Sequence, residues 1–135
     1  MKNGGYEEID HTADLALRVW GEDFYALLIQ SAKGMYELMN LEYDPNSEGR
    51  FQFLIKLSEC ENMLVDFLSE LLFVSEDKQK SLADFSFEKS GDRVNITAKS
   101  YAIQKLRKNI KAVTFHDLEI KWTEKGQETV ITFDV

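Results

Sequence analysis

Three carboxylate groups at predicted strand ends carry the most distinctive chemistry in this sequence. Asp14 comes directly before an alternating segment that begins at Leu15, Asp134 is the penultimate residue, and Val135 carries the α-carboxylate. The letters VITFDV predict a strand that runs to the last residue, and pairing in a sheet would hold that carboxylate in place. Oxygen ligands suit a hard divalent cation, namely calcium, magnesium or manganese, better than zinc. The alternative is that each aspartate is a solvated turn residue.

Two histidines and one cysteine are the remaining candidates for chemistry. His11 and Thr12 precede Asp14 in the letters HTAD, where His11 either supports a metal site or forms a hydrogen bond within the corner. His116 has the strand parity of apolar neighbours, which predicts a partly buried, hydrogen-bonded histidine. Cys60 lies between two glutamates, which raise the pKa of a thiol, so we interpret it as structural. No phosphate-binding loop, zinc-binding cysteine pair or nucleophile elbow occurs in the sequence.

The elements that must position these residues follow from hydrophobic periodicity. A first helix is predicted from residue 21 to about residue 40, with two acids at its start, and a second from 61 to 75. The apolar stripe of the second helix predicts core packing. The expected strands are 6–9, 15–20, 51–57, 82–88, 93–99, 110–122 and 128–135. This order predicts a single domain, 1–135, of the α+β class: a two-layer sandwich of a mainly antiparallel sheet with both helices on one face.

Composition limits the classes of partner. The chain has 24 acidic and 16 basic residues and a net charge of −8, which argues against direct binding of nucleic acid. One cysteine, no signal peptide and no long apolar run predict a cytoplasmic protein without a membrane partner. The exception to the acidity is the segment KLRKNIK. It is either a solvated loop or a basic patch for a phosphate or an acidic partner, and its basic residues are Lys105, Arg107, Lys108 and Lys111.

Five segments resemble the archease family in the family's own order. They are YEEIDHTADLALRVWG, EDFYALLIQSAKGMYELM, NMLVDFLSELLF, IKAVTFHDLEI and VITFDV. The resemblance implies an α+β fold and a non-enzymatic protein cofactor. Such a cofactor activates the RtcB-family tRNA-splicing RNA ligase, which uses GTP and manganese, by promoting its guanylylation and multiple turnover.

The resemblance also implies roles for particular residues. The family's metal ligands correspond to Asp14, Asp134 and Val135, and we expect the ion to be calcium, with magnesium or manganese as alternatives. The residues expected to support that site or face the partner are His11, Thr12, Lys111 and His116. Many relatives carry a Gly-Glu pair and a further histidine before the KAVTFH strand, whereas this chain has neither, so the resemblance assigns no role to residues 99–110.

Two other functions use the same features. A chaperone-like adaptor for a tRNA methyltransferase would bind that enzyme without needing Asp14. A small metal-dependent phosphoester hydrolase would use the carboxylates to activate water, although the sequence offers little basic surface for a phosphodiester and no clear general base.

Overall fold

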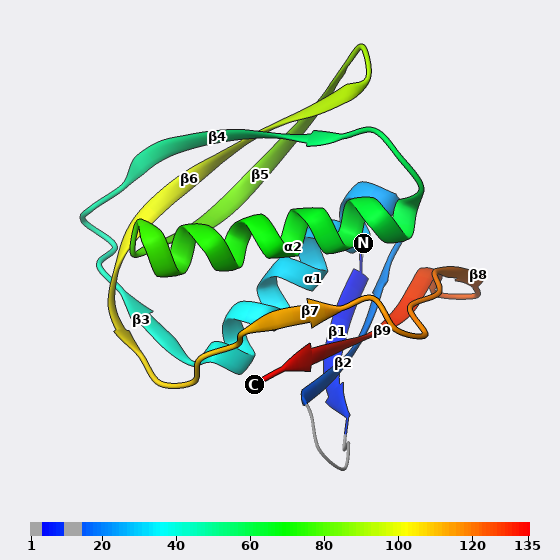
Figure 1. Cartoon of the computed structure of the whole chain (residues 1–135), viewed down its shortest axis with the longest axis horizontal. Coiled ribbons are helices and arrows are strands. Elements are labelled where there is room, and N and C mark those ends of the chain that lie inside the picture. Colours follow the sequence, from blue (N-terminus) through cyan, green and yellow to red (C-terminus); the bar gives the residue numbers. More distant parts are fainter. Residues whose placement is uncertain (1–3, 10–14) are drawn as a thin grey trace.

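The structure is a computed structural model that describes residues 4–9 and 15–135 (Figure 1). The helices of these residues are α1 (Phe24–Met39) and α2 (Cys60–Asp77). The strands are β1 (Gly4–Ile9), β2 (Leu15–Gly21), β3 (Leu41–Tyr43), β4 (Gly49–Lys56), β5 (Lys80–Ser90), β6 (Arg93–Leu106), β7 (Ala112–Thr114), β8 (Lys121–Thr123) and β9 (Gly126–Asp134). Neither α1 nor α2 has the length and apolar character that a membrane crossing requires.

The strands form two antiparallel sheets. In the first sheet the order is β1-β2-β9-β7, with β8 also paired to β9, and in the second sheet β6 pairs with β3, β4 and β5. Both helices contact both sheets: α1 contacts β2 and β5, and α2 contacts β4 and β7 (Figure 1). The predicted α+β sandwich of antiparallel strands and two amphipathic helices is confirmed. Its division into two sheets is a finding that hydrophobic periodicity did not reveal.

Helix α1 begins at Phe24, three residues after the predicted start, and ends at Met39, next to the predicted end. Asp23 is the N-cap, and its side chain accepts a hydrogen bond from the N–H of Ala26 at 2.8 Å. At the other end Asn40 adopts a left-handed conformation with φ 50°, which asparagine tolerates better than most residues. Both signals lie in the sequence next to the helix, and for that reason the bounds of α1 could be predicted to within three residues.

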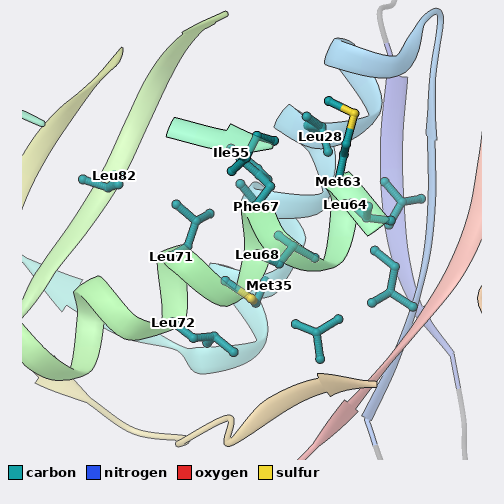
Figure 2. Close-up of a cluster of buried hydrophobic side chains, with 14 of the residues drawn as sticks. Leu28, Met35, Ile55, Met63, Leu64, Phe67, Leu68, Leu71, Leu72 and Leu82 are labelled. Atoms are coloured by element: carbon teal, nitrogen blue, oxygen red, sulfur yellow. The ribbon is translucent and has the colours of Figure 1, made fainter. Parts of the chain in front are cut away.

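The predicted apolar stripe of α2 lies in the core (Figure 2). Phe67 is fully buried, and its ring centroid lies 6.1 Å from that of Phe53, 5.2 Å from Phe85 and 5.9 Å from Phe87. Rings at such separations add to the free energy gained by burying their area. This aromatic cluster fixes α2 against the second sheet. The remaining buried members of the stripe are Leu64, Leu68, Leu71 and Leu72.

The basic segment KLRKNIK is partly a strand and partly a support for α1. Strand β6 continues to Leu106 and pairs there with β3, a strand that the sequence analysis missed. Arg107 forms an ion pair with Glu42 and donates a hydrogen bond to the carbonyl oxygen of Asn40 at 3.2 Å. The same guanidinium lowers the pKa of the Glu42 carboxyl. Part of this positive charge therefore stabilises the end of α1 and the turn into β3.

The predicted strand 110–122 is interrupted. It forms β7 and β8, and the residues between them are not a strand. Asp117 adopts a left-handed conformation with φ 58°, and the backbone N–H of Ile120 donates to Glu61 Oε2 at 3.0 Å. The alternating pattern therefore continues through a segment that does not pair as a strand. The backbone of this segment bonds instead to side chains, Glu61 of α2 and Thr129 of β9.

Removal of the Phe67 ring tests the role of the aromatic cluster. Phe67→Ala should lower the free energy of unfolding by about 3–5 kcal/mol, because it leaves a cavity among three other rings. Phe73→Ala is the matched control on the same helix. Its side chain is 56% exposed, so its loss should change stability by no more than about 0.5 kcal/mol. Urea titration followed by circular dichroism measures both, and equal losses for the two variants would refute this packing.

Candidate functional site

The predicted site residues fall into two groups. His11, Thr12 and Asp14 lie outside the described residues. Asp134 and Val135 lie inside them, at the end of β9, where both side chains are exposed. The carboxylate oxygens of Asp134 therefore lie at the surface.

The end of β9 is paired on both sides. Phe133 pairs with Leu15 of β2 on one side and with Val113 of β7 on the other, and its side chain is fully buried. Asp134 pairs with Ala112, and its backbone oxygen accepts a hydrogen bond from the N–H of Lys111 at 2.8 Å. A strand end usually frays, but here sheet pairing and core burial fix it through Asp134.

Alternation along β9 explains why the side chain of Asp134 points to the surface. Ile131 and Phe133 alternate into the core, and this alternation directs Asp134 to the opposite face. The hydroxyl of Thr114 donates to the carbonyl oxygen of Thr132 at 3.1 Å and adds a second link between β7 and β9. The result is a rigid strand end with an exposed carboxylate.

The donor chemistry of this strand end fits a hard cation. Its side-chain donor is the carboxylate of Asp134, and calcium and magnesium bind oxygen ligands. Across residues 4–9 and 15–135, no three His, Cys, Asp or Glu side chains gather into a metal-binding group. A site at the end of β9 would therefore need oxygen atoms beyond the side chains of the described residues.

His116 differs from its prediction. The expected partly buried histidine is instead 87% exposed at its side chain, and Nε2 lies 3.1 Å from a carboxylate oxygen of its neighbour Asp117. The strand parity that suggested burial does not apply, because β7 ends at Thr114. Lys111 is also exposed and lies one residue before β7. Both residues are therefore placed on the surface and available to a partner.

Cys60 has the environment of an unreactive thiol. Burial, and then the negative charge of Glu61, raise the pKa of the thiol above its usual value. A raised pKa leaves less of the nucleophilic thiolate at neutral pH. This agrees with the interpretation of Cys60 as structural.

A groove of about 770 Å³ lies beside α1 and was not predicted from the sequence. Its walls include Tyr6 and Tyr36, which come from β1 and α1. The hydroxyl of Tyr6 donates to Glu37 Oε1 at 2.6 Å, and this bond raises the pKa of Tyr6 to about 12. Burial raises the pKa of Tyr36, whose hydroxyl oxygen accepts the N–H of Leu82 at 3.1 Å. Only the folded chain brings these tyrosines together, so no local sequence signal marked the groove.

Comparison with known proteins gives a consistent result. The sequence profile described as "Archease protein family (MTH1598/TM1083)" matches residues 6–135. A protein archease of Methanosarcina barkeri is 27% identical over 139 residues, which cover 96% of this chain and 95% of that protein. A protein archease of Methanopyrus kandleri is 27% identical over 124 residues, or 86% of this chain and 89% of that protein.

Two solved structures share the fold. A crystal structure described as an archease and possible chaperone from Thermotoga maritima aligns with a TM-score of 0.70 and 23% identity, and it covers 96% of both chains. The solution structure of protein 1598 of Methanobacterium thermoautotrophicum aligns with a TM-score of 0.71 and 24% identity, and it covers 97% of this chain and 99% of that one. These structures extend the agreement from sequence to three dimensions.

The backbone bond between Lys111 and Asp134 gives a direct test of how the strand end is fixed. Lys111→Pro removes the N–H donor and should lower the free energy of unfolding by about 1 kcal/mol and speed amide exchange at Phe133. Lys111→Ala keeps the donor and should behave like the unmodified protein in both respects. Hydrogen exchange followed by NMR distinguishes them. Slow exchange at Phe133 in the proline variant would mean that the strand end does not depend on this bond.

Proposed function

Because the chain belongs to the archease family, we propose that it acts as a non-enzymatic protein cofactor of an RtcB-family tRNA-splicing RNA ligase. In this proposal it promotes guanylylation of a ligase that uses GTP and manganese, and it allows that ligase to turn over repeatedly. The observation that carries the proposal is the fixed end of β9, which holds exposed carboxylate oxygens on a rigid strand. A protein that acts at another enzyme's nucleotide site needs such a preorganised group.

We assign the metal ligands of this proposal to Asp14, Asp134 and the carboxylate of Val135. Asp14 is joined by one peptide bond to Leu15, and Leu15 pairs with Phe133, the residue before Asp134. The ion would be calcium, with magnesium or manganese as alternatives, because every ligand is an oxygen. When bound, the ion would supply a positive charge beside the carboxylates at the end of β9.

The residues around the strand end have defined tasks in this proposal. The backbone N–H of Lys111 holds Asp134, and burial of Phe133 keeps the strand end from moving. The exposed side chains of Lys111 and His116 would face the ligase, while His11 and Thr12 would shape the corner that presents Asp14. A cofactor of this kind works by binding one state of the ligase better than another, and a preformed surface makes that difference larger.

The charge of the chain supports an action on the enzyme and not on RNA. The net charge is −8, and phosphate contacts supply most of the affinity of proteins that bind RNA directly. In the basic segment, Arg107 is already bound within the protein, where it forms an ion pair with Glu42 and donates a hydrogen bond to the carbonyl oxygen of Asn40. We therefore propose that the protein acts on the ligase without binding RNA directly. Its single cysteine favours a reducing compartment, and we propose that it acts in the cytoplasm.

Multiple-turnover ligation by the cognate ligase, with GTP and manganese, tests the proposal. Addition of this protein should convert a single turnover into many. Asp134→Asn should weaken this activation by about 10-fold or more. Mutation of a residue that only hydrogen-bonds to a metal ligand already costs about 10-fold in metal affinity, and loss of a ligand itself should cost at least as much.

Glu88→Gln is the control for that experiment, because it removes one exposed carboxylate from β5, away from the strand end. It should activate the ligase as well as the unmodified protein does. A ligase that is indifferent to the protein, or full activation by Asp134→Asn, would contradict the proposal.

Extension of the chain by one glycine after Val135 tests the role of the terminal carboxylate. The extension moves that carboxylate by about 3.3 Å along the strand direction and should reduce activation of the ligase. Val135→Ala keeps the carboxylate at its position and should leave activation unchanged. Equal activity of the extended and unextended proteins in the ligation assay would remove Val135 from the ligand set.

A chaperone-like adaptor for a tRNA methyltransferase is the second candidate function. The observation in its favour is the description of the Thermotoga maritima protein as a possible chaperone. This function predicts stable binding to the methyltransferase that Asp134→Asn does not weaken. The same variant therefore separates the two proposals.

A further inference from the structure

The two edges of the second sheet are built differently. Strand β5 has a register shift between Ala83 and Ser86, and Asp84 adopts a left-handed conformation with φ 54°. Such bulges protect an edge from pairing with another chain. Strand β4 pairs with β6 in continuous register over residues 49–56, and no other strand of the described residues pairs with it. The β4 edge therefore lacks the bulge that protects β5.

The backbone groups on this edge can be identified. The N–H of Leu57 donates to the carbonyl oxygen of Asp92 at 2.8 Å, on the side of β6. Successive residues of a strand direct their backbone groups to alternate sides, so the odd-numbered residues face β6. Gln52, Leu54 and Lys56 consequently direct N–H and C=O groups to the open side of β4.

A groove of about 440 Å³ follows this open edge. Leu54 and Phe73 are large apolar side chains at the groove, and they are 58% and 56% exposed. Helix α2 forms the opposite wall, and Figure 1 shows it running beside β4. The charged groups of the lining are two carboxylates and one ammonium, and the full lining is Leu54, Ile55, Lys56, Asp66, Ser69, Glu70 and Phe73. An open strand edge, a helix alongside it and apolar side chains are the components of sites that bind extended peptides.

We propose that the groove between β4 and α2 binds an extended segment of a partner protein, which adds to the sheet as a strand next to β4. The outward backbone groups of Gln52, Leu54 and Lys56 would bond to the segment. Side chains on one face of the segment would lie beside Leu54, and those on the other face would lie beside α2 and Phe73. The carboxylates of Asp66 and Glu70 outnumber the ammonium of Lys56, so the segment would carry lysine or arginine.

Charge favours a partner protein over a second copy of this chain. If two β4 edges paired about a two-fold axis, Asp66 and Glu70 of both copies would lie at the same interface. Each copy also carries a net charge of −8, which opposes self-association. A basic extended segment meets no such repulsion. This proposal does not depend on the metal site or on activation of the ligase.

NMR titration of the full chain with a capped octapeptide of alternating valine and lysine tests the proposal. The amides of Gln52, Leu54 and Lys56 should shift and exchange more slowly, while Ser86 on β5 should not change. The same peptide with every amide N-methylated should bind about 10-fold more weakly or worse, because it has no N–H donors. A glutamate-for-lysine version should also bind more weakly.

Two variants separate the backbone groups from the charges. Leu54→Pro removes one outward N–H, which an edge strand tolerates, and should weaken binding about 5-fold or more. The double variant Asp66→Asn, Glu70→Gln should weaken binding of the lysine peptide and remove its preference over the glutamate version. If Leu54→Pro fails to fold, binding of the N-methylated peptide to the unmodified protein still tests whether backbone hydrogen bonds are needed.

Three results would overturn the proposal. The first is shift changes that lie elsewhere on the chain, and the second is equal binding of the N-methylated peptide. The third is detection by sedimentation of a dimer that the Leu54→Pro substitution dissociates. That result would assign the β4 edge to a second copy of this chain.

Discussion

Pairing of β9 on both sides is the interaction on which the rest of the structure depends. β2 lines one side of this strand, and β7 and β8 line the other. This pairing buries Ile131 and Phe133 in the core and at the same time fixes Asp134 at the surface. If β9 were free, the last residues of the strand would be mobile, and the Asp134 carboxylate would have no fixed position. Stability and the candidate site thus share one strand.

Helix α2 connects the core to the surfaces proposed for function. Phe67 of α2 packs against Phe53, Phe85 and Phe87 and so fixes the helix on the second sheet. The outer face of α2 carries Asp66, Glu70 and the exposed Phe73. The same helix contacts β7, the strand that flanks Asp134. One rigid element therefore supports both the strand end and the groove beside β4. The two surfaces remain independent in chemistry, because one offers carboxylates to a cation and the other offers backbone groups to a peptide.

The parts of the fold that the sequence predicted are those with local causes. Asp23 and Asn40 marked the ends of α1, and alternation marked β2 and β9. The misses have non-local causes. β3 forms because Arg107 and the far end of β6 return to Glu42, and no short-range pattern shows this. The far end of β6 was also missed, because its last residues begin the basic run KLRKNIK, which composition alone favours as a loop.

The candidate site was predictable only in part. The sequence identified Asp134 as an exposed carboxylate at a strand end, and the structure adds its pairing with β7 and its bond to Lys111. Alternation failed for His116, because the chain leaves the sheet after Thr114. The open edge of β4 was invisible to the sequence, since which strands lie at an edge depends on the order of strands in the whole sheet. Asp14, His11 and Thr12 remain predictions.

The central claim is that a divalent cation binds at the end of β9, and paramagnetic broadening by manganese tests it most directly. Substoichiometric Mn²⁺ added to the ¹⁵N-labelled protein should broaden the amides of Leu15, Ala112 and Asp134 first, and excess calcium should restore them. The amides of Leu54 and Ser86, in the second sheet, should stay sharp at the same manganese concentration. Broadening that begins at other carboxylates, or that leaves Asp134 unaffected, would contradict the claim.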